Sequence, residues 1–291
     1  PPPLIAAGGQ PGVKRTSGRP AHRTTFAAGL ALVGIASAIA LWVGYEFGGT
    51  AVLYDRAQQI LLLNFKDNVA ASAGTTPADG APMAILSIPR LNASEVVVQG
   101  TTPADLEQGP GHYAASPLPG EFGNVLIMGR RTTYGGPFRD LDQLVSGDRI
   151  TLTTANGTFT YVVSRLQSAS AGQAQLLDGT PDSRLTLVTS TPEYLPTGRL
   201  AVVAKLQGQP LDLPKTPSTS VKPNLLGLAG DPNGLLVAAA WAAALLMAIA
   251  LTVRIGRRWP VAVRNLLATP VLLTLFLLVC INLGHALPGM L

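Results

Sequence analysis

The fold class is decided by the stretch DRITLTTANGTFTYVVSRL, residues 148–166. Apolar and β-branched residues alternate with polar ones on both sides of Asn156-Gly157, which is the period of a half-buried strand. Asn-Gly is the strongest two-residue hairpin signal, because both turn positions favour a positive φ. The stretch therefore predicts a β-hairpin. The alternating residues are Ile150, Leu152 and Thr154 before the turn, and Phe159, Tyr161 and Val163 after it.

Further short β-rich runs flank this hairpin on both sides. Three runs precede the hairpin, at 83–91, 94–100 and 124–131. Two more follow it, at 183–190 and 199–206. About seven short strands in roughly 125 residues favour a β-barrel or a β-sandwich. The alternation alone leaves both architectures open.

Three uncharged or nearly uncharged runs are predicted to be transmembrane helices: 25–47, 234–253 and 265–284. At 1.5 Å per residue each can cross a hydrocarbon layer of ~30 Å. A cleaved signal peptide is the alternative for the first run, although its apolar core is longer than the ~7–15 residues usual there. A buried soluble hairpin is the alternative for the other two.

The positions of the charges orient these predicted helices. Residues 1–24 and the loop 254–264 each contain four Lys or Arg and no acid, so the positive-inside rule makes both cytoplasmic. The chain is then a multi-pass plasma-membrane protein with its β domain outside the cytoplasm. The other predicted parts are an external helix and linker at 48–82, the barrel at 83–206, a Pro-rich linker at 207–233 and an external C-terminus at 285–291. Within 48–82 the helix is predicted from Tyr54 to Asn68, with Ile60, Leu61 and Phe65 on its apolar face.

Composition excludes several classes of function. Residues 81–207 contain nine Lys or Arg and ten Asp or Glu, so the basic excess lies at the membrane flanks and nucleic-acid binding is not indicated. The one cysteine, Cys280, lies in a predicted membrane span, which excludes a disulfide framework and a multi-cysteine metal site. The three histidines are scattered. We therefore expect no metal and no cofactor.

The order of the segments IPRL, VVVQGTTPADLEQGPGHY, PGEFGNVLIMGRRTTYGGPFRDLDQLVSGDRI, LTLVTSTP and RLAVVAKL resembles the sortase family. Within it, the similarity is to the class E or D type of actinobacterial membranes, and a composition rich in Ala, Gly and Arg is compatible with such a source. The resemblance covers roughly residues 83–206. It implies a mainly β fold with a closed barrel of about eight strands outside the membrane. Sortases are cysteine transpeptidases that cut a sorting signal and join the product to the cell wall or a pilin.

Two of the three catalytic positions that the resemblance implies are changed in this chain. The catalytic histidine of sortases matches Arg130 in the segment Gly129-Arg130-Arg131, and the nucleophilic cysteine matches Ser190. The arginine at the start of the last strand is matched by Arg199. A guanidinium has no acceptor and a pKa above ~12, so Arg130 cannot take a proton from a nucleophile. Because serine needs an adjacent base, we expect no catalytic residues and a chain that is not an enzyme.

An alternative keeps the chemistry with Ser190 as the nucleophile of a transpeptidase or acyltransferase. It requires a substitute base, and His112 is the external histidine within the barrel region. The resemblance also allows His112 to be a structural residue that holds its loop, because related sortases have it beside their catalytic histidine.

Our main hypothesis is an accessory or assembly subunit of a cell-envelope membrane complex. The predicted binding residues are Arg130, Arg131, Ser190 and Arg199, since guanidinium groups suit carboxylates and phosphates. They could bind an anionic lipid, a wall fragment or a peptide, or instead pair with Asp140, Asp142 or Glu193. The expected partner is a larger integral membrane protein, because the Ala-rich span 234–253 suits close helix packing.

Overall fold

The computed structural model describes residues 34, 37, 40–69, 74–170, 180–193, 197–211, 232–255 and 261–286 of the 291. Its elements, in chain order, are η1 (Tyr45–Gly49), α2 (Thr50–Asn68), β1 (Pro82–Ile88), η2 (Pro89–Leu91), β2 (Ala93–Gln99), α3 (Pro103–Gln108), β3 (Gly111–His112), β4 (Asn124–Met128), η3 (Leu141–Gln143), β5 (Arg149–Thr154), β6 (Gly157–Ser170), β7 (Arg184–Thr191), β8 (Gly198–Leu206), α4 (Pro232–Ile255) and α5 (Val261–Ala286).

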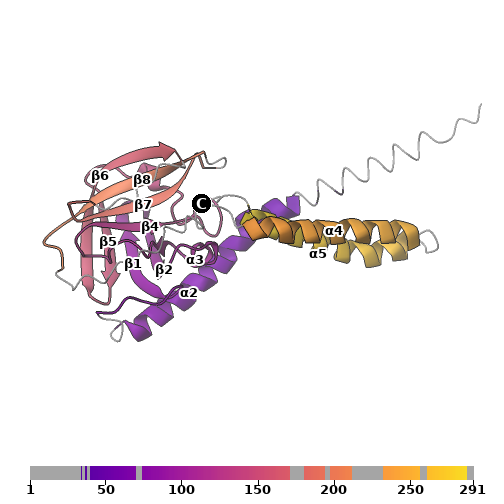
Figure 1. The fold of residues 1–291 in the computed structure, drawn as a ribbon, viewed down its shortest axis with the longest axis horizontal. Helices are drawn as coiled ribbons and strands as arrows, with labels where there is room; N and C mark the ends of the chain where they lie inside the picture. Colours follow the sequence, from indigo (N-terminus) through magenta and orange to yellow (C-terminus); the bar gives the residue numbers. More distant parts are fainter. Residues whose placement is uncertain are drawn as a thin grey trace, which may run out of the picture. The chain divides into compact units, whose positions relative to one another are not determined.

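Eight strands close into a barrel in the order β1-β2-β3-β4-β7-β8-β6-β5 (Figure 1). This confirms the prediction of a mainly β, closed barrel. Two of the pairings, β2 with β3 and β4 with β7, are parallel, and the other six are antiparallel. A parallel pair cannot be made by a hairpin, so the β4–β7 contact brings together segments about 60 residues apart.

The β5–β6 hairpin forms as predicted, but its turn lies one residue earlier than expected. Thr154 pairs with Gly157, so the two turn residues are Ala155 and Asn156. The positive φ occurs at Gly157, at 130°, after the turn and not inside it. Glycine supplies this backbone conformation without a Cβ clash, and this explains why the Asn-Gly signal located the turn correctly but misplaced its centre.

The barrel wall has two faces with different neighbours. Side chains alternate along a strand, so Ile127 and Leu187 point into the barrel core. Their neighbours Met128 and Val188 point the other way, into a small outer cluster that also contains Leu106 of α3. This alternation decides which face each residue at the end of β4 and β7 can reach.

Helix α2 packs beside β1, β2 and α3 (Figure 1). A helix was predicted from Tyr54 to Asn68, and it begins four residues earlier, at Thr50. Leu61 and Phe65 are buried as expected. Ile60, predicted on the same apolar face, is 59% exposed.

The prediction of three transmembrane helices is not supported. Among the described residues, the only helix long and apolar enough to cross a membrane is Leu235–Arg254, within α4. Within α5, the described stretch Ala268–Asn282 is a shorter apolar helix. Most of the first predicted span, 25–47, lies outside the described residues.

One candidate membrane helix supports membrane anchoring only weakly. It does not support the multi-pass arrangement or its orientation. The predicted cytoplasmic segment 1–24 lies outside the described residues, as do most of the linker 207–233 and residues 256–260 of the loop 254–264. Helices α4 and α5 pack against each other.

Candidate active site

Gly129 fastens the end of β4 to the end of β7. Its N–H donates to the carbonyl of Val188 at 3.1 Å, and its carbonyl accepts from the Thr189 hydroxyl at 2.9 Å. A Cβ at Gly129 would lie 2.5 Å from the ring of Phe138, so a larger residue could not keep this position. The next residues of the two strands, Arg130 and Ser190, are therefore held at the same end of the barrel.

Ser190 lies on the outer face of β7, in register with Arg199 of β8. It alternates with Thr189, whose side chain bonds to Gly129, and shares its face with Val188. Residues directly opposite in an antiparallel pair point to the same side, so Arg199 lies beside Ser190. Ser190 is 0% exposed and Arg199 is 8% exposed. Burial lowers the pKa of Arg199 from its ordinary value, although a guanidinium retains its charge.

Arg131 is a structural arginine that supports the strand carrying Ser190. Its Nη1 donates to the carbonyl of Ser190 at 3.0 Å, and its Nε donates to the carbonyl of Arg139 at 3.2 Å. Its Nη2 forms an ion pair with Asp142 at 2.9 Å. Of the pairings predicted for these arginines, the one with Asp142 is thus present. These three contacts point the guanidinium at protein atoms, so we do not assign Arg131 a ligand.

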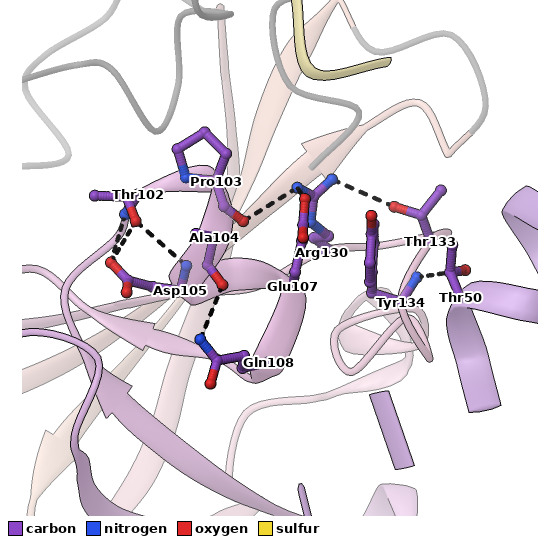
Figure 2. Close-up of polar contacts among 10 residues, drawn as sticks. All are labelled: Thr50, Thr102, Pro103, Ala104, Asp105, Glu107, Gln108, Arg130, Thr133 and Tyr134. Carbon is purple, nitrogen blue, oxygen red and sulfur yellow. Dashed lines mark hydrogen bonds and ion pairs between the residues drawn. The ribbon is translucent and has the colours of Figure 1, made fainter. Parts of the chain in front are cut away.

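Arg130 lies in a partly buried cluster formed by α3 and by the loop after β4 (Figure 2). Its guanidinium lies 4.8 Å from the centre of the Tyr134 ring and 3.8 Å from the Glu107 carboxylate. It also donates to the carbonyl of Pro103 and to the hydroxyl of Thr133, both at 3.5 Å. This arrangement presents a fixed cation near the end of β7, with an aromatic face below it.

A capping box places α3 next to Arg130. The Thr102 hydroxyl accepts from the N–H of Asp105, and the Asp105 carboxylate accepts from the N–H of Thr102 at 2.9 Å (Figure 2). These bonds begin a helix of one and a half turns that carries the Pro103 carbonyl and Glu107 towards Arg130.

His112 lies on the opposite face of the barrel wall from Ser190. It pairs with Ile127, which belongs to the interior cluster. Its Nε2 lies 2.9 Å from the Pro117 carbonyl, and its Nδ1 lies 2.9 Å from the side chain of Gln99. A carbonyl only accepts, so Nε2 carries the hydrogen of the neutral ring. The geometry argues against His112 as a substitute base and supports its structural role.

Comparison with known proteins identifies the domain. Residues 86–207 match the family model described as the sortase domain. The chain is a member of the sortase family, of class D/E-like type.

The curated relatives and solved structures carry sortase names. Sortase D of Bacillus subtilis is 38% identical over 100 residues, 34% of this chain and 49% of the relative. Sortase SrtE1 of Streptomyces coelicolor is 30% identical over 186 residues, 57% of this chain and 52% of the relative. The chain thus spans about half the length of these curated relatives.

Two solved structures are similar to the chain. One is a Clostridium perfringens sortase D5, described as a transpeptidase, at 28% identity and a TM-score of 0.49 over 53% of this chain and 99% of that one. The other is sortase E from Streptomyces avermitilis, at 33% identity and a TM-score of 0.42 over 49% of this chain and 99% of that one.

The prediction that the chain is not an enzyme is contradicted by these comparisons. The family model and the curated relatives that match this chain are sortases, which are transpeptidases. The prediction rested on the change of the expected histidine to Arg130 and of the expected cysteine to Ser190. The alternative stated with it, a transpeptidase or acyltransferase, agrees better with these comparisons.

Sequence reasoning missed three residues of this sortase site: Glu107, Tyr134 and Thr50. The Thr-Pro-Ala-Asp segment before Leu106 is a recognisable capping box and would have predicted the helix that carries Glu107. No local pattern indicated Tyr134 or Thr50. Tyr134 contacts Arg130 within the loop that joins β4 to η3, residues 129–140, called the Arg130 loop below. Thr50 reaches this loop only through the tertiary placement of α2, by its hydrogen bond with Tyr134.

The burial of His112 makes the stability of the sortase domain depend on pH. Desolvation lowers the pKa of His112 from 6.5 to about 4. At pH 7 the ring is neutral in both states. Between pH 6.5 and 4 the unfolded chain takes up a proton that the folded chain does not, so stability falls as the pH falls, by roughly 3 kcal/mol over that window.

Thermal unfolding followed by calorimetry between pH 7.5 and 4 measures this dependence. His112→Gln removes the titrating group and should flatten the profile between pH 6.5 and 4 relative to the parent. Parallel profiles for parent and variant would show that His112 does not cause the loss.

Proposed function

We propose that this sortase-family chain is an acyltransferase or transpeptidase that uses Ser190 as its nucleophile. The observation that carries the proposal is the pairing of Ser190 with Arg199 at the end of β7, beside the Arg130 loop that Gly129 fastens there. The same strand end carries the nucleophilic cysteine in sortases.

The reaction has two steps. The Ser190 hydroxyl oxygen attacks the carbonyl carbon of the acyl donor, the bond to the leaving group breaks, and an ester forms on Ser190. The hydroxyl proton passes to solvent water, and the leaving group departs as its anion. An acceptor amine then attacks the ester, forms the new amide and releases its proton, which restores the Ser190 hydroxyl. No external oxidant or reductant is needed.

Arginine in place of histidine selects the acyl donor. Arg130 cannot take the proton from Ser190 or deliver it to a leaving amine, and such proton transfer is worth ~10²–10⁴ in rate. The site therefore favours donors such as esters and thioesters, whose leaving groups depart without being protonated. The cations of Arg130 and Arg199 suit an anionic group on the donor, such as a peptide carboxylate, a lipid headgroup or a wall fragment.

Removal of the Ser190 hydroxyl should abolish acyl transfer. With a peptide thioester as donor and an amine as acceptor, Ser190→Ala should lose all enzyme-dependent product, measured by mass spectrometry. The matched control is Ser94→Ala, an exposed serine on β2, which should retain the parental rate. A serine-directed acyl probe should label the parent and not Ser190→Ala. If the parent takes up no acyl group from either reagent, the proposal is wrong.

The double substitution Ser190→Cys and Arg130→His rebuilds the residue set of the family around Arg199. A thiol beside a histidine is partly thiolate at neutral pH, and the imidazole can return the proton to a leaving amine. With a peptide amide donor, we expect transfer at least ~10²-fold faster than in the parent. Ser190→Cys alone should gain much less. Equal rates for the double and single variants would show that position 130 does not face the nucleophile.

A second candidate function is membership of a cell-envelope membrane complex with a larger integral membrane protein. It is favoured by α4, whose candidate membrane span Leu235–Arg254 is almost unburied in the described structure apart from its contact with α5. The small residues along this span allow close approach of another helix, although packing within a bilayer can also be satisfied by lipid.

Extraction of native membranes in a mild detergent tests this second candidate. A stoichiometric membrane partner should co-purify with the chain. Exchange of Ala239 and Ala243 for Leu on the exposed side of α4 should weaken that association without changing acyl transfer. Recovery of the chain without any partner would contradict this candidate and leave the acyl-transfer proposal untouched.

A further inference from the structure

One face of helix α2 contacts the Arg130 loop. Thr50, Tyr54 and Gln58 are spaced four residues apart, so they lie along the same side of the helix. The Thr50 hydroxyl is fully buried and accepts from the N–H of Tyr134 at 3.2 Å (Figure 2). The ring of Tyr54 packs against Gly135 so closely that a Cβ there would lie 2.5 Å from it.

The segment 134–136, which α2 contacts, has a backbone conformation that is unfavourable for a non-glycine residue. Tyr134, Gly135 and Gly136 all have positive φ, at 48°, 74° and 57°. Glycine adopts this conformation freely, but a tyrosine does so at a cost. A non-glycine residue stays in the left-handed region only where its surroundings impose it. The hydrogen bond to Thr50 and the packing of Tyr54 are two such constraints.

The strained turn sets the position of the Arg130 side chain. The Tyr134 ring lies 4.8 Å from the Arg130 guanidinium, and the Thr133 hydroxyl accepts from it at 3.5 Å. The main chain closes the loop as well, because the N–H of Phe138 donates to the carbonyl of Arg130 at 3.1 Å. Movement of Tyr134 would therefore carry away the aromatic face over which Arg130 is placed.

The lower part of the same helix face holds a different segment. Gln58 accepts from the N–H of Val96 at 2.7 Å and donates to the carbonyls of Val96 and Gln108 at 3.1 and 2.8 Å. Tyr54 also donates to Glu95. Gln58 thus fixes α2 to β2 and α3 without touching the turn, which separates docking of the helix from control of the loop.

We propose that α2 is a positioning element of the active site, in which Thr50 and Tyr54 hold the left-handed turn 134–136 and thereby place residue 130 beside Ser190. The inference rests on the proposed function, since position 130 matters for chemistry only if Ser190 reacts. It adds Thr50 and Tyr54 as positioning residues that act through Tyr134 and do not touch the acyl group.

Hydrogen–deuterium exchange of single amides in the full chain tests the structural half without any acyl donor. Thr50→Val keeps the shape of the side chain and removes the acceptor, so exchange at Tyr134 should speed up on the order of tenfold. Thr50→Ser keeps the hydroxyl and should stay near the parental rate. Gln58→Ala should speed up exchange at Val96 and leave Tyr134 unchanged. If both Thr50→Val and Gln58→Ala speed up both amides equally, α2 merely undocks and the inference is wrong.

The chemical half is tested in the Ser190→Cys/Arg130→His background. The rate of alkylation of the introduced thiol against pH reports how closely the introduced imidazole approaches it. Addition of Thr50→Val should shift this profile to higher pH, whereas addition of Gln58→Ala should not. An unchanged profile with Thr50→Val would overturn the positioning role. Failure of acyl transfer in the parent would contradict the proposed function but would alter neither readout.

Discussion

The site depends on the pair of hydrogen bonds by which Gly129 joins the end of β4 to the end of β7. They extend the parallel β4–β7 ladder by one residue, and they set Arg130 and Ser190 at one level of the barrel wall. The absence of a side chain at Gly129 is required because Phe138 occupies that space. Every other feature of the site builds on this junction: Arg131 buttresses the Ser190 carbonyl, and β8 brings Arg199 alongside.

The three arginines near Ser190 have different physical roles although they are the same residue type. Arg131 donates hydrogen bonds to two carbonyls and forms an ion pair with Asp142, so its guanidinium stabilises the local fold. Arg199 is desolvated beside Ser190, where a cation can act on charge that develops during reaction. In the proposed function, Arg130 contributes a cation at the position where sortases have a base, so electrostatic binding takes the place of proton transfer.

The outer helices connect this junction to the part of the chain that precedes the barrel. Helix α3 contributes a carbonyl and Glu107 to the surroundings of Arg130, and α2 reaches the same loop through Thr50 and Tyr54. Tyr134, a non-glycine residue with a positive φ, lies where these elements meet. A non-glycine residue keeps such a backbone conformation where the surrounding structure, rather than local preference, determines it.

The sequence by itself determined the β character of the domain, the β5–β6 hairpin and the family, because each depends on local alternation, turn chemistry or motif order. Through the motifs that contain them, it also indicated Ser190 and Arg130 as changed site positions and Arg199 as the matching one. Only the tertiary structure separated Arg131 from a ligand-binding role and His112 from Ser190. The reason is that side-chain alternation shows which residues share a face of one strand, but not which faces of different strands coincide. The parallel β4–β7 register and the packing of α2 are contacts between distant segments, and these decided where each charge and each hydroxyl lies.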